Sequence, residues 1–148
     1  MLAVVERVSQ AMVTVDERET GSIRAGLLVL LGVEKGDTDE DLDYIVRKVS
    51  GLRIFSSNGK MDKSVTDIGG QILVVSQFTL AGDARKGKRP DFTRAAEPQT
   101  AKDMYEKCIA AFRAMGIITG EGEFGAHMSV RSTGDGPVTI LLSSKRAF

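Results

Sequence analysis

The run Gly26-Leu27-Leu28-Val29-Leu30-Leu31-Gly32-Val33 (GLLVLLGV) is the clearest indication of how this chain folds. Both faces of an extended chain here would be apolar, which predicts a central strand that is covered on both sides. Residues Gln71–Leu80 begin with a similar apolar run, Ile72–Val75, directly after the break Gly69-Gly70. Strands of this kind need other layers packed on them, and helices are the usual covering.

Two segments have the periodicity of amphipathic helices. The first, Asp37–Ser50, can be capped by Asp37 or Thr38, and Glu40 stands three residues after Asp37 as in a capping box. The second begins near Pro98, a favourable first-turn residue, and ends at Gly116. The apolar faces contain Leu42, Ile45, Val46 and Val49 in the first helix and Ala101, Met104, Tyr105, Cys108, Ile109, Phe112 and Met115 in the second.

Shorter strands are expected elsewhere. They cover Leu2–Val8 and Ala11–Val15 with a turn between them, Arg53–Phe55 before an Asn-Gly turn within Ser56–Lys60, Phe124–Val130, and Val138–Leu142. Strands outnumber helices, and the helices lie between groups of strands. The sequence therefore predicts an α+β fold, a single domain over residues 1–148 with a strongly curved, mostly antiparallel sheet and two main helices.

Composition narrows the class of protein. The chain of 148 residues is 42% apolar and 27% charged, which is ordinary for a soluble globular domain. No apolar run reaches the roughly 18 residues of a membrane helix, and the first residues lack the basic region of a signal peptide. With a single cysteine, Cys108, we expect a cytoplasmic protein without a membrane partner. The formal net charge is zero, so binding of nucleic acid would depend on local basic patches.

Residue types that usually carry catalysis are scarce. His127 is the only histidine and Cys108 the only cysteine, and P-loop, dinucleotide-binding and GxSxG motifs are absent, so we expect neither a metal nor a cofactor. Cys108 lies in the apolar stripe of a helix, where a core position is the ordinary interpretation. His127 lies on the polar phase of its predicted strand, which favours a surface or rim histidine over a general base.

Two segments carry groups that could contact a ligand. Ser76-Gln77-Phe78-Thr79 follows directly on a buried strand, and its polar side chains could bind either a ligand or their own backbone. The segment Gly134-Asp135-Gly136-Pro137-Val138-Thr139 has the composition of a turn between two strands. Spacing alone leaves the first segment open between a structural and a functional role, and it favours a plain hairpin turn for the second.

Together these segments resemble the paired signatures SQxxT and NxGPxT of the D-aminoacyl-tRNA deacylase (D-tyrosyl-tRNA deacylase) family. Ser76–Leu80 has the family form SQFTL, which places the threonine at Thr79, although a strict count of the pattern would reach Leu80. Gly136–Thr139 matches the second signature. Further similar segments follow in order along the chain, namely Arg7-Val8, Gly26–Glu34, Leu52–Phe55, Gly59–Met61, Lys88–Phe92 and Phe124–Met128.

Two residues depart from the family pattern. Gly134 stands where Asn is usual, so anchoring by that amide is missing or passes to Asp135. His127 stands in FGAxM, where an acidic or apolar residue is more usual. Both departures concern local contacts and leave the resemblance over the rest of the chain intact.

The resemblance implies an enzyme that hydrolyses the ester of D-aminoacyl-tRNA, and of glycine mischarged on alanine tRNA, on a fold with a barrel-like core. It implies a homodimer with the active site at the subunit interface, where a cis Gly136-Pro137 peptide reaches into the partner's pocket and excludes L-residues by collision. Hydrolysis would rest on main-chain groups and on the 2′-hydroxyl of the terminal adenosine, and an alternative makes Thr79 the nucleophile. The implied catalytic residues are Ser76, Gln77, Phe78 and Thr79, and the implied pocket residues are Phe124, Gly125, Ala126, Met128 and Thr139.

Physical reasoning is compatible with main-chain chemistry. No base adjoins Thr79 in the sequence, and an aminoacyl ester is already activated, so positioning and N–H donors to the oxyanion could suffice. Arg7 is a candidate for holding the Gly-Pro segment, because a charge in an apolar strand needs a partner. The basic residues Arg85, Lys86, Lys88 and Arg89 are candidates for contacts to acceptor-stem phosphates, with a merely solvated loop as the alternative.

Two other functions compete with this one. A non-catalytic RNA-binding module could grip the acceptor end, but the neutral charge argues against it. The six Phe and two Tyr, without Trp, lie mostly in core-like positions and offer no evident stacking surface. A general hydrolase of small esters would use Thr79 and would lack a base.

Overall fold

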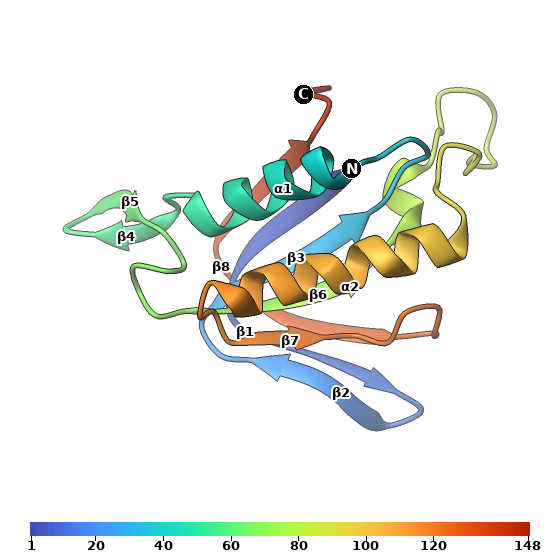
Figure 1. The fold of residues 1–148 in the computed structure, drawn as a ribbon. Coiled ribbons are helices and arrows are strands. Elements are labelled where there is room, and N and C mark those ends of the chain that lie inside the picture. The colour runs from blue at the N-terminus through green and yellow to red at the C-terminus, as the bar shows by residue number, and fades with distance from the viewer.

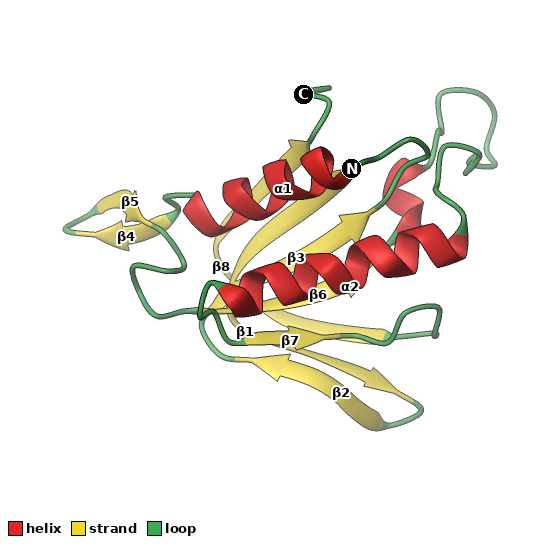
Figure 2. Ribbon diagram, in the orientation of Figure 1, coloured by secondary structure: helices red, strands yellow, loops and turns green.

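The computed structural model describes all residues, 1–148. It folds as one α+β unit in which two long helices lie on a curved sheet (Figures 1 and 2). The elements are β1 (Leu2–Val15), β2 (Arg18–Ile23), β3 (Gly26–Gly32), α1 (Asp39–Gly51), β4 (Phe55–Ser57), β5 (Lys60–Lys63), β6 (Gln71–Ser76), the 3-10 helix η1 (Phe78–Ala81), α2 (Pro98–Ala114), β7 (Thr119–Glu121) and β8 (Ser129–Ser143).

A long hairpin forms the framework of the sheet. β1 runs without a break to a tight turn at Asp16 and Glu17, both with positive φ, and the chain returns as β2 and β3, antiparallel to β1. The predicted turn between Val8 and Ala11 is therefore wrong. Both residues pair with the returning chain on one side and lie along β8 on the other, so these pairings hold the strand extended through this point.

The sheet is mixed and nearly closed. β3 pairs in parallel with β6, and β6 in parallel with β7, whereas β1 pairs antiparallel with β2, β3 and β8. β7 curls back against β2 so closely that a Cβ on Gly21 would come within 2.3 Å of the Glu121 carbonyl oxygen. The predicted fold class, a curved sheet with a barrel-like core and two helices, is confirmed. The predicted central strand is β3, which lies between β1 and β6 and is almost wholly buried.

The helices cover one face of this sheet and complete the main hydrophobic core (Figure 1). α1 is capped by Thr38, one of the two predicted cap residues. Its N–H donates to the Asp41 carboxylate at 2.8 Å, so the capping box pairs Thr38 with Asp41 and not Asp37 with Glu40. α2 begins at Pro98 as predicted, and its buried stripe ends at Phe112, leaving Met115 47% exposed. No helix is both long enough and apolar enough to cross a membrane.

Three other local predictions differ from the structure. The strand predicted to reach Leu80 ends at Ser76, because the chain turns into η1. Residues Phe124–Met128 form a turn with Gly125 at φ 79°, and β8 starts only at Ser129. The hairpin predicted after Arg53–Phe55 does form around Asn58-Gly59, but its first strand, β4, begins at Phe55.

The segment predicted as a turn, Gly134–Thr139, instead lies within β8. Glu6 pairs with Thr139 and Val8 pairs with Gly134, so the intervening residues 135–138 all lie opposite Arg7 alone. They form a bulge on an edge strand, and an edge strand tolerates a proline because its lost N–H can face away from the ladder. The turn-like composition of this segment therefore marks a bulge within a strand and not a turn between two strands.

Candidate active site

The segment Ser76–Thr79 lies at the carboxyl end of the buried strand β6. The N–H of Gln77 donates to the Leu31 carbonyl at 2.8 Å, which holds the segment against β3. The first backbone hydrogen bond of η1 runs from the Leu80 N–H to the Gln77 carbonyl, at 3.3 Å. The N–H groups of Phe78 and Thr79 precede it and have no partner within the helix, so they can serve as donors to an oxyanion.

The Thr79 hydroxyl lacks a base. Its oxygen accepts a hydrogen bond from the Gln77 side-chain amide at 2.8 Å, and an amide donor cannot take its proton. His127 lines a different hollow, together with Thr14, Asp16, Glu17, Ser129 and Arg131. Burial raises the pKa of the Cys108 thiol to about 12, so that side chain is an inert core residue.

The turn Phe124–Met128 packs toward the same strand end. The Phe124 ring lies 5.8 Å from the Tyr105 ring, and the Tyr105 hydroxyl donates to the Val74 carbonyl of β6 at 3.0 Å. Burial raises the pKa of Tyr105, which keeps this hydroxyl protonated as a donor. The Ala126 N–H closes the turn on the Glu123 carbonyl at 3.2 Å, and the Met128 sulfur accepts from the Glu123 N–H at 3.4 Å. Four of the predicted pocket residues therefore lie in one compact turn, namely Phe124, Gly125, Ala126 and Met128.

Gly136 and Pro137 lie on the exposed bulge of β8, and the peptide between them is cis. Arg7 connects this bulge to the start of β4. Its Nε donates to the Asp135 carbonyl at 2.9 Å and its Nη1 to the Ile54 carbonyl at 2.6 Å. The Arg7 side chain is only 11% exposed, and the Asp135 carboxylate lies 3.5 Å from it. The remaining predicted pocket residue, Thr139, is exposed on β8.

One chain does not bring the two motifs together. β1 and β3 lie between β8 and β6 in the sheet, and three strand spacings amount to about 14 Å. Gly134 departs from the family pattern. A side chain at this position would put its Cβ 3.2 Å from a carboxylate oxygen of Glu6. Any site that uses both motifs would have to draw one of them from another chain.

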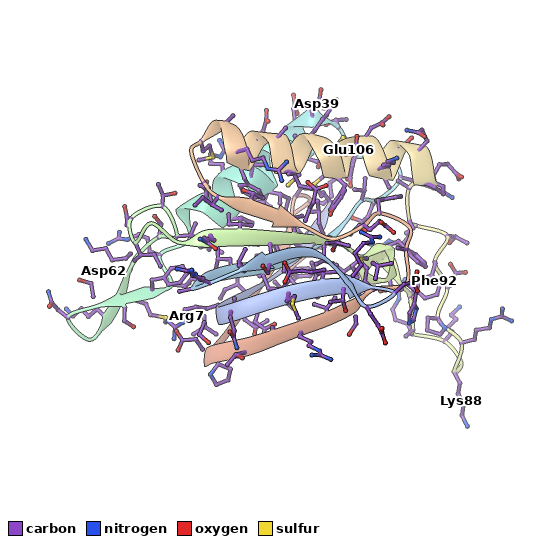
Figure 3. All side chains as sticks on the ribbon, turned by 90° about the horizontal axis from the view of Figure 1, so that it is seen from below. Arg7, Asp39, Asp62, Lys88, Phe92 and Glu106 are labelled. Carbon is purple, nitrogen blue, oxygen red and sulfur yellow. The ribbon has the colours of Figure 1, made fainter.

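The basic loop contains one paired and three unpaired cations. Arg85 donates to both carboxylate oxygens of Asp83, and this ion pair raises the pKa of Arg85 and lowers that of Asp83. Asp83 therefore offsets the charge of Arg85, and the role of Arg85 in phosphate binding stays a prediction. The others have no ion pair and are called the free loop cations: Lys86, Lys88 and Arg89. Figure 3 shows Lys88 at the far tip of the loop, well away from Arg7.

Sequence reasoning missed an exposed aromatic residue at the base of this loop. Phe92 is 37% exposed and packs edge-to-face on Phe78, which is 58% exposed. The available signal was its place directly after the basic run, in Lys88-Arg89-Pro90-Asp91-Phe92. Elsewhere, no group of three or more His, Cys, Asp or Glu side chains gathers in a way that could hold a metal ion.

Comparisons with known proteins assign the chain to a family. The sequence model described as D-Tyr-tRNA(Tyr) deacylase matches residues 4–143. The D-aminoacyl-tRNA deacylases of Clostridioides difficile (strain 630) and Thermotoga petrophila are each 54% identical over 149 residues, covering 100% of this chain and of the relative. The solved structure of the c-Myc DNA Unwinding Element Binding Protein has a TM-score of 0.90 at 42% identity, covering 97% of this chain and 98% of that chain. A probable eukaryotic D-amino acid tRNA deacylase has the same fold, with a TM-score of 0.80 at 19% identity over 95% of this chain and 97% of that chain. The chain therefore belongs to the D-aminoacyl-tRNA deacylase family and is a hydrolase of that proofreading class.

Proposed function

We propose that the chain hydrolyses the ester of D-aminoacyl-tRNA with main-chain groups of Ser76–Thr79, in a homodimer where Gly136-Pro137 of one subunit completes the site of the other. One observation carries this proposal. The N–H groups of Phe78 and Thr79 have no partner within η1, while the Thr79 hydroxyl accepts from Gln77 and has no base. The segment thus supports oxyanion stabilisation better than a side-chain nucleophile.

The reaction then needs little covalent chemistry from the protein. Water adds to the ester carbonyl carbon, and the two N–H groups donate to the oxyanion of the tetrahedral intermediate. The bond to the ribose oxygen breaks and this oxygen takes one proton of the attacking water. The amino acid leaves as a carboxylate, and the other proton of that water passes to solvent. The 2′-hydroxyl of the terminal adenosine assists from the substrate side. One oxyanion donor typically contributes about 100- to 1000-fold in rate, which suits an ester that is already activated.

Exclusion of L-residues would come from the Gly-Pro bulge. Gly136 has no side chain, so a bound α-carbon can approach its backbone closely, and Arg7 holds the neighbouring Asp135 carbonyl. An L-side chain would point at this backbone, whereas a D-side chain would point away from it. Glycine has no side chain and would pass the same filter, which supports activity on glycine mischarged on alanine tRNA.

The open edge of β8 supports the homodimer. This strand of 15 residues pairs with β1 only, and Val130 and Leu141 on it are 40% and 57% exposed. Long unpaired edges with exposed apolar side chains are usually covered, and a second copy related by a two-fold axis is the common solution. A second copy would also supply the Gly-Pro bulge that the Ser76–Thr79 segment lacks within its own chain. Because the substrate is charged tRNA, we place the enzyme in the cytoplasm.

Rates on D-tyrosyl-tRNA and L-tyrosyl-tRNA test this proposal when they are measured over a dilution series that dissociates the dimer. We expect hydrolysis of the D-substrate only, with activity per chain falling as the dimer dissociates. Sedimentation velocity on the same samples gives the oligomeric state. Comparable rates on both enantiomers, or a monomer that still discriminates between them, would refute the mechanism.

A further inference from the structure

Two exposed aromatic rings lie side by side next to the proposed catalytic segment. Phe78 and Phe92 are 58% and 37% exposed, with ring centroids 5.3 Å apart and planes at 70°. The large rings of Tyr105 and Phe112, in contrast, are buried in the core. Since burial would stabilise the folded chain, a contiguous exposed pair is not accounted for by packing within one chain and points to a binding surface.

The surrounding backbone fixes the place of Phe92. Two hydrogen bonds between Asp83 and Asp91, at 2.7 and 2.9 Å, close the neck of the basic loop, and Phe92 follows this neck directly. The ring lies over Gly82, where a Cβ would come within 2.9 Å of it. Figure 3 shows Phe92 at the base of the loop that carries Lys88. The ring therefore lies between the free loop cations and the segment Ser76–Thr79.

This order of groups matches the order of groups at the end of a charged tRNA. The ester is on the last nucleotide, the unpaired nucleotides come before it, and the paired acceptor stem with its phosphates lies beyond them. Proteins that bind unpaired nucleotides combine a cationic path with aromatic rings, and stacking tolerates any base because every base has a π-face. An enzyme that acts on many tRNAs needs this kind of tolerance.

We infer that Phe92, braced edge-on by Phe78, stacks the unpaired base that precedes the esterified nucleotide. The inference rests on the proposed placement of the ester at Ser76–Thr79. Phe92 touches no reacting atom in this arrangement, so it is a positioning residue for the 3′ end. Its loss therefore weakens binding of tRNA and leaves the chemical step intact. The stacking surface that the sequence did not reveal would then be this aromatic pair.

The test compares Phe92→Leu with Phe92→Tyr on two substrates, D-tyrosyl-tRNA and the D-tyrosyl ester of adenosine alone. Leu keeps an apolar side chain over Gly82 but removes the ring face, and Tyr keeps the ring face. For tRNA we expect Phe92→Leu to raise KM roughly 5- to 150-fold, as loss of one stacked base does, with kcat unchanged. Phe92→Tyr should resemble the wild type. Phe148→Leu removes a ring that is even more exposed, 67%, at another place, and it should leave KM and kcat unchanged on both substrates.

The adenosine ester separates stacking from a structural role, because it lacks the preceding base. Its kcat/KM should be the same for Phe92→Leu and the wild type. An equal loss on both substrates, or an unchanged KM for tRNA, would overturn the inference. Phe92→Met provides a second apolar variant if Phe92→Leu does not fold. Failure of the wild type to prefer D- over L-tyrosyl-tRNA would instead refute the proposed function, and the inference with it.

Discussion

Replacing Arg7 should have two effects: it should release the Gly-Pro bulge from its anchor and lower the stability of the fold. Arg7→Ala removes two hydrogen bonds from a charged donor and leaves the Ile54 carbonyl, in a buried residue, without its partner. Each such bond contributes about 1.5–3 kcal/mol, so we expect a loss of about 3 kcal/mol or more in the free energy of unfolding. At roughly 2–4 °C per kcal/mol for a chain of this size, Tm should fall by roughly 6–12 °C.

Arg7→Lys separates charge from geometry. The ammonium keeps the charge and most of the stem, but it cannot donate along both the Nε and the Nη1 directions at once. It should cost about half as much as Arg7→Ala, roughly 1.5 kcal/mol, and should still lower the ratio of D- to L-tyrosyl-tRNA hydrolysis.

Urea unfolding and the D/L rate ratio measure the two effects in the same samples. Arg47→Ala is the matched control, because Arg47 is exposed on α1 and its guanidinium makes no hydrogen bond or ion pair, and it should change the free energy of unfolding by less than about 0.5 kcal/mol. An Arg7→Ala protein with unchanged stability and an unchanged D/L ratio would refute the anchoring role.

Contacts of Thr79, of the free loop cations and of Asp41 can each be tested by substitution. Thr79→Ala should keep a substantial share of kcat, because its hydroxyl accepts from an amide and has no base; a loss of several orders of magnitude in a folded dimer would restore the nucleophile role. Changing the three free loop cations to Gln should raise KM for tRNA and reduce the log–log salt dependence by roughly 2–3 units. Changing Arg85 as well should add little, and an unchanged salt slope would mean that the loop is only solvated. Burial opposes ionisation of Asp41, but hydrogen bonds from Lys145, Ser144 and Thr38 outweigh it and hold its pKa well below the ordinary 3.8. Its carboxylate therefore stabilises the fold above that value, and this stability is lost as pH falls through the folded pKa, so Asp41→Asn should flatten the acid limb of the pH–stability curve.

The sequence predicted those parts of the fold that burial imposes locally. In β3, α1 and α2 the spacing of apolar residues predicts which faces are buried. All three elements are present near the predicted bounds. The errors concern pairings between distant segments. Nothing near Val8 shows that β8 will hold β1 straight, and nothing near Asp135 shows that its segment will bulge from an edge strand opposite Arg7.

The candidate site was predicted as a set of segments but not as a geometry. Asp83 forms an ion pair with Arg85. The two-residue separation between them could have suggested this pair, whereas a count of the basic residues in the loop could not. A Cβ on Gly136 would meet Val138 and Arg7 of its own chain at 2.9 and 3.0 Å, so crowding there would first disturb the bulge rather than a substrate pocket. Phe92 was missed because exposure of a ring depends on packing, which composition does not report.

The pairing of the first long strand with the last one constrains how the chain can be made. Leu2 pairs with Ser143, so β1 emerges from the ribosome long before its partner on that side exists. At ~5–20 residues per second the interval is roughly 7–30 s, far longer than a hairpin needs to form. Throughout that time β1 can complete its pairing with β2 and β3 while its other edge remains exposed. Slow synthesis thus lengthens the period in which a nascent chain could pair wrongly along β1, and this period ends only when β8 arrives.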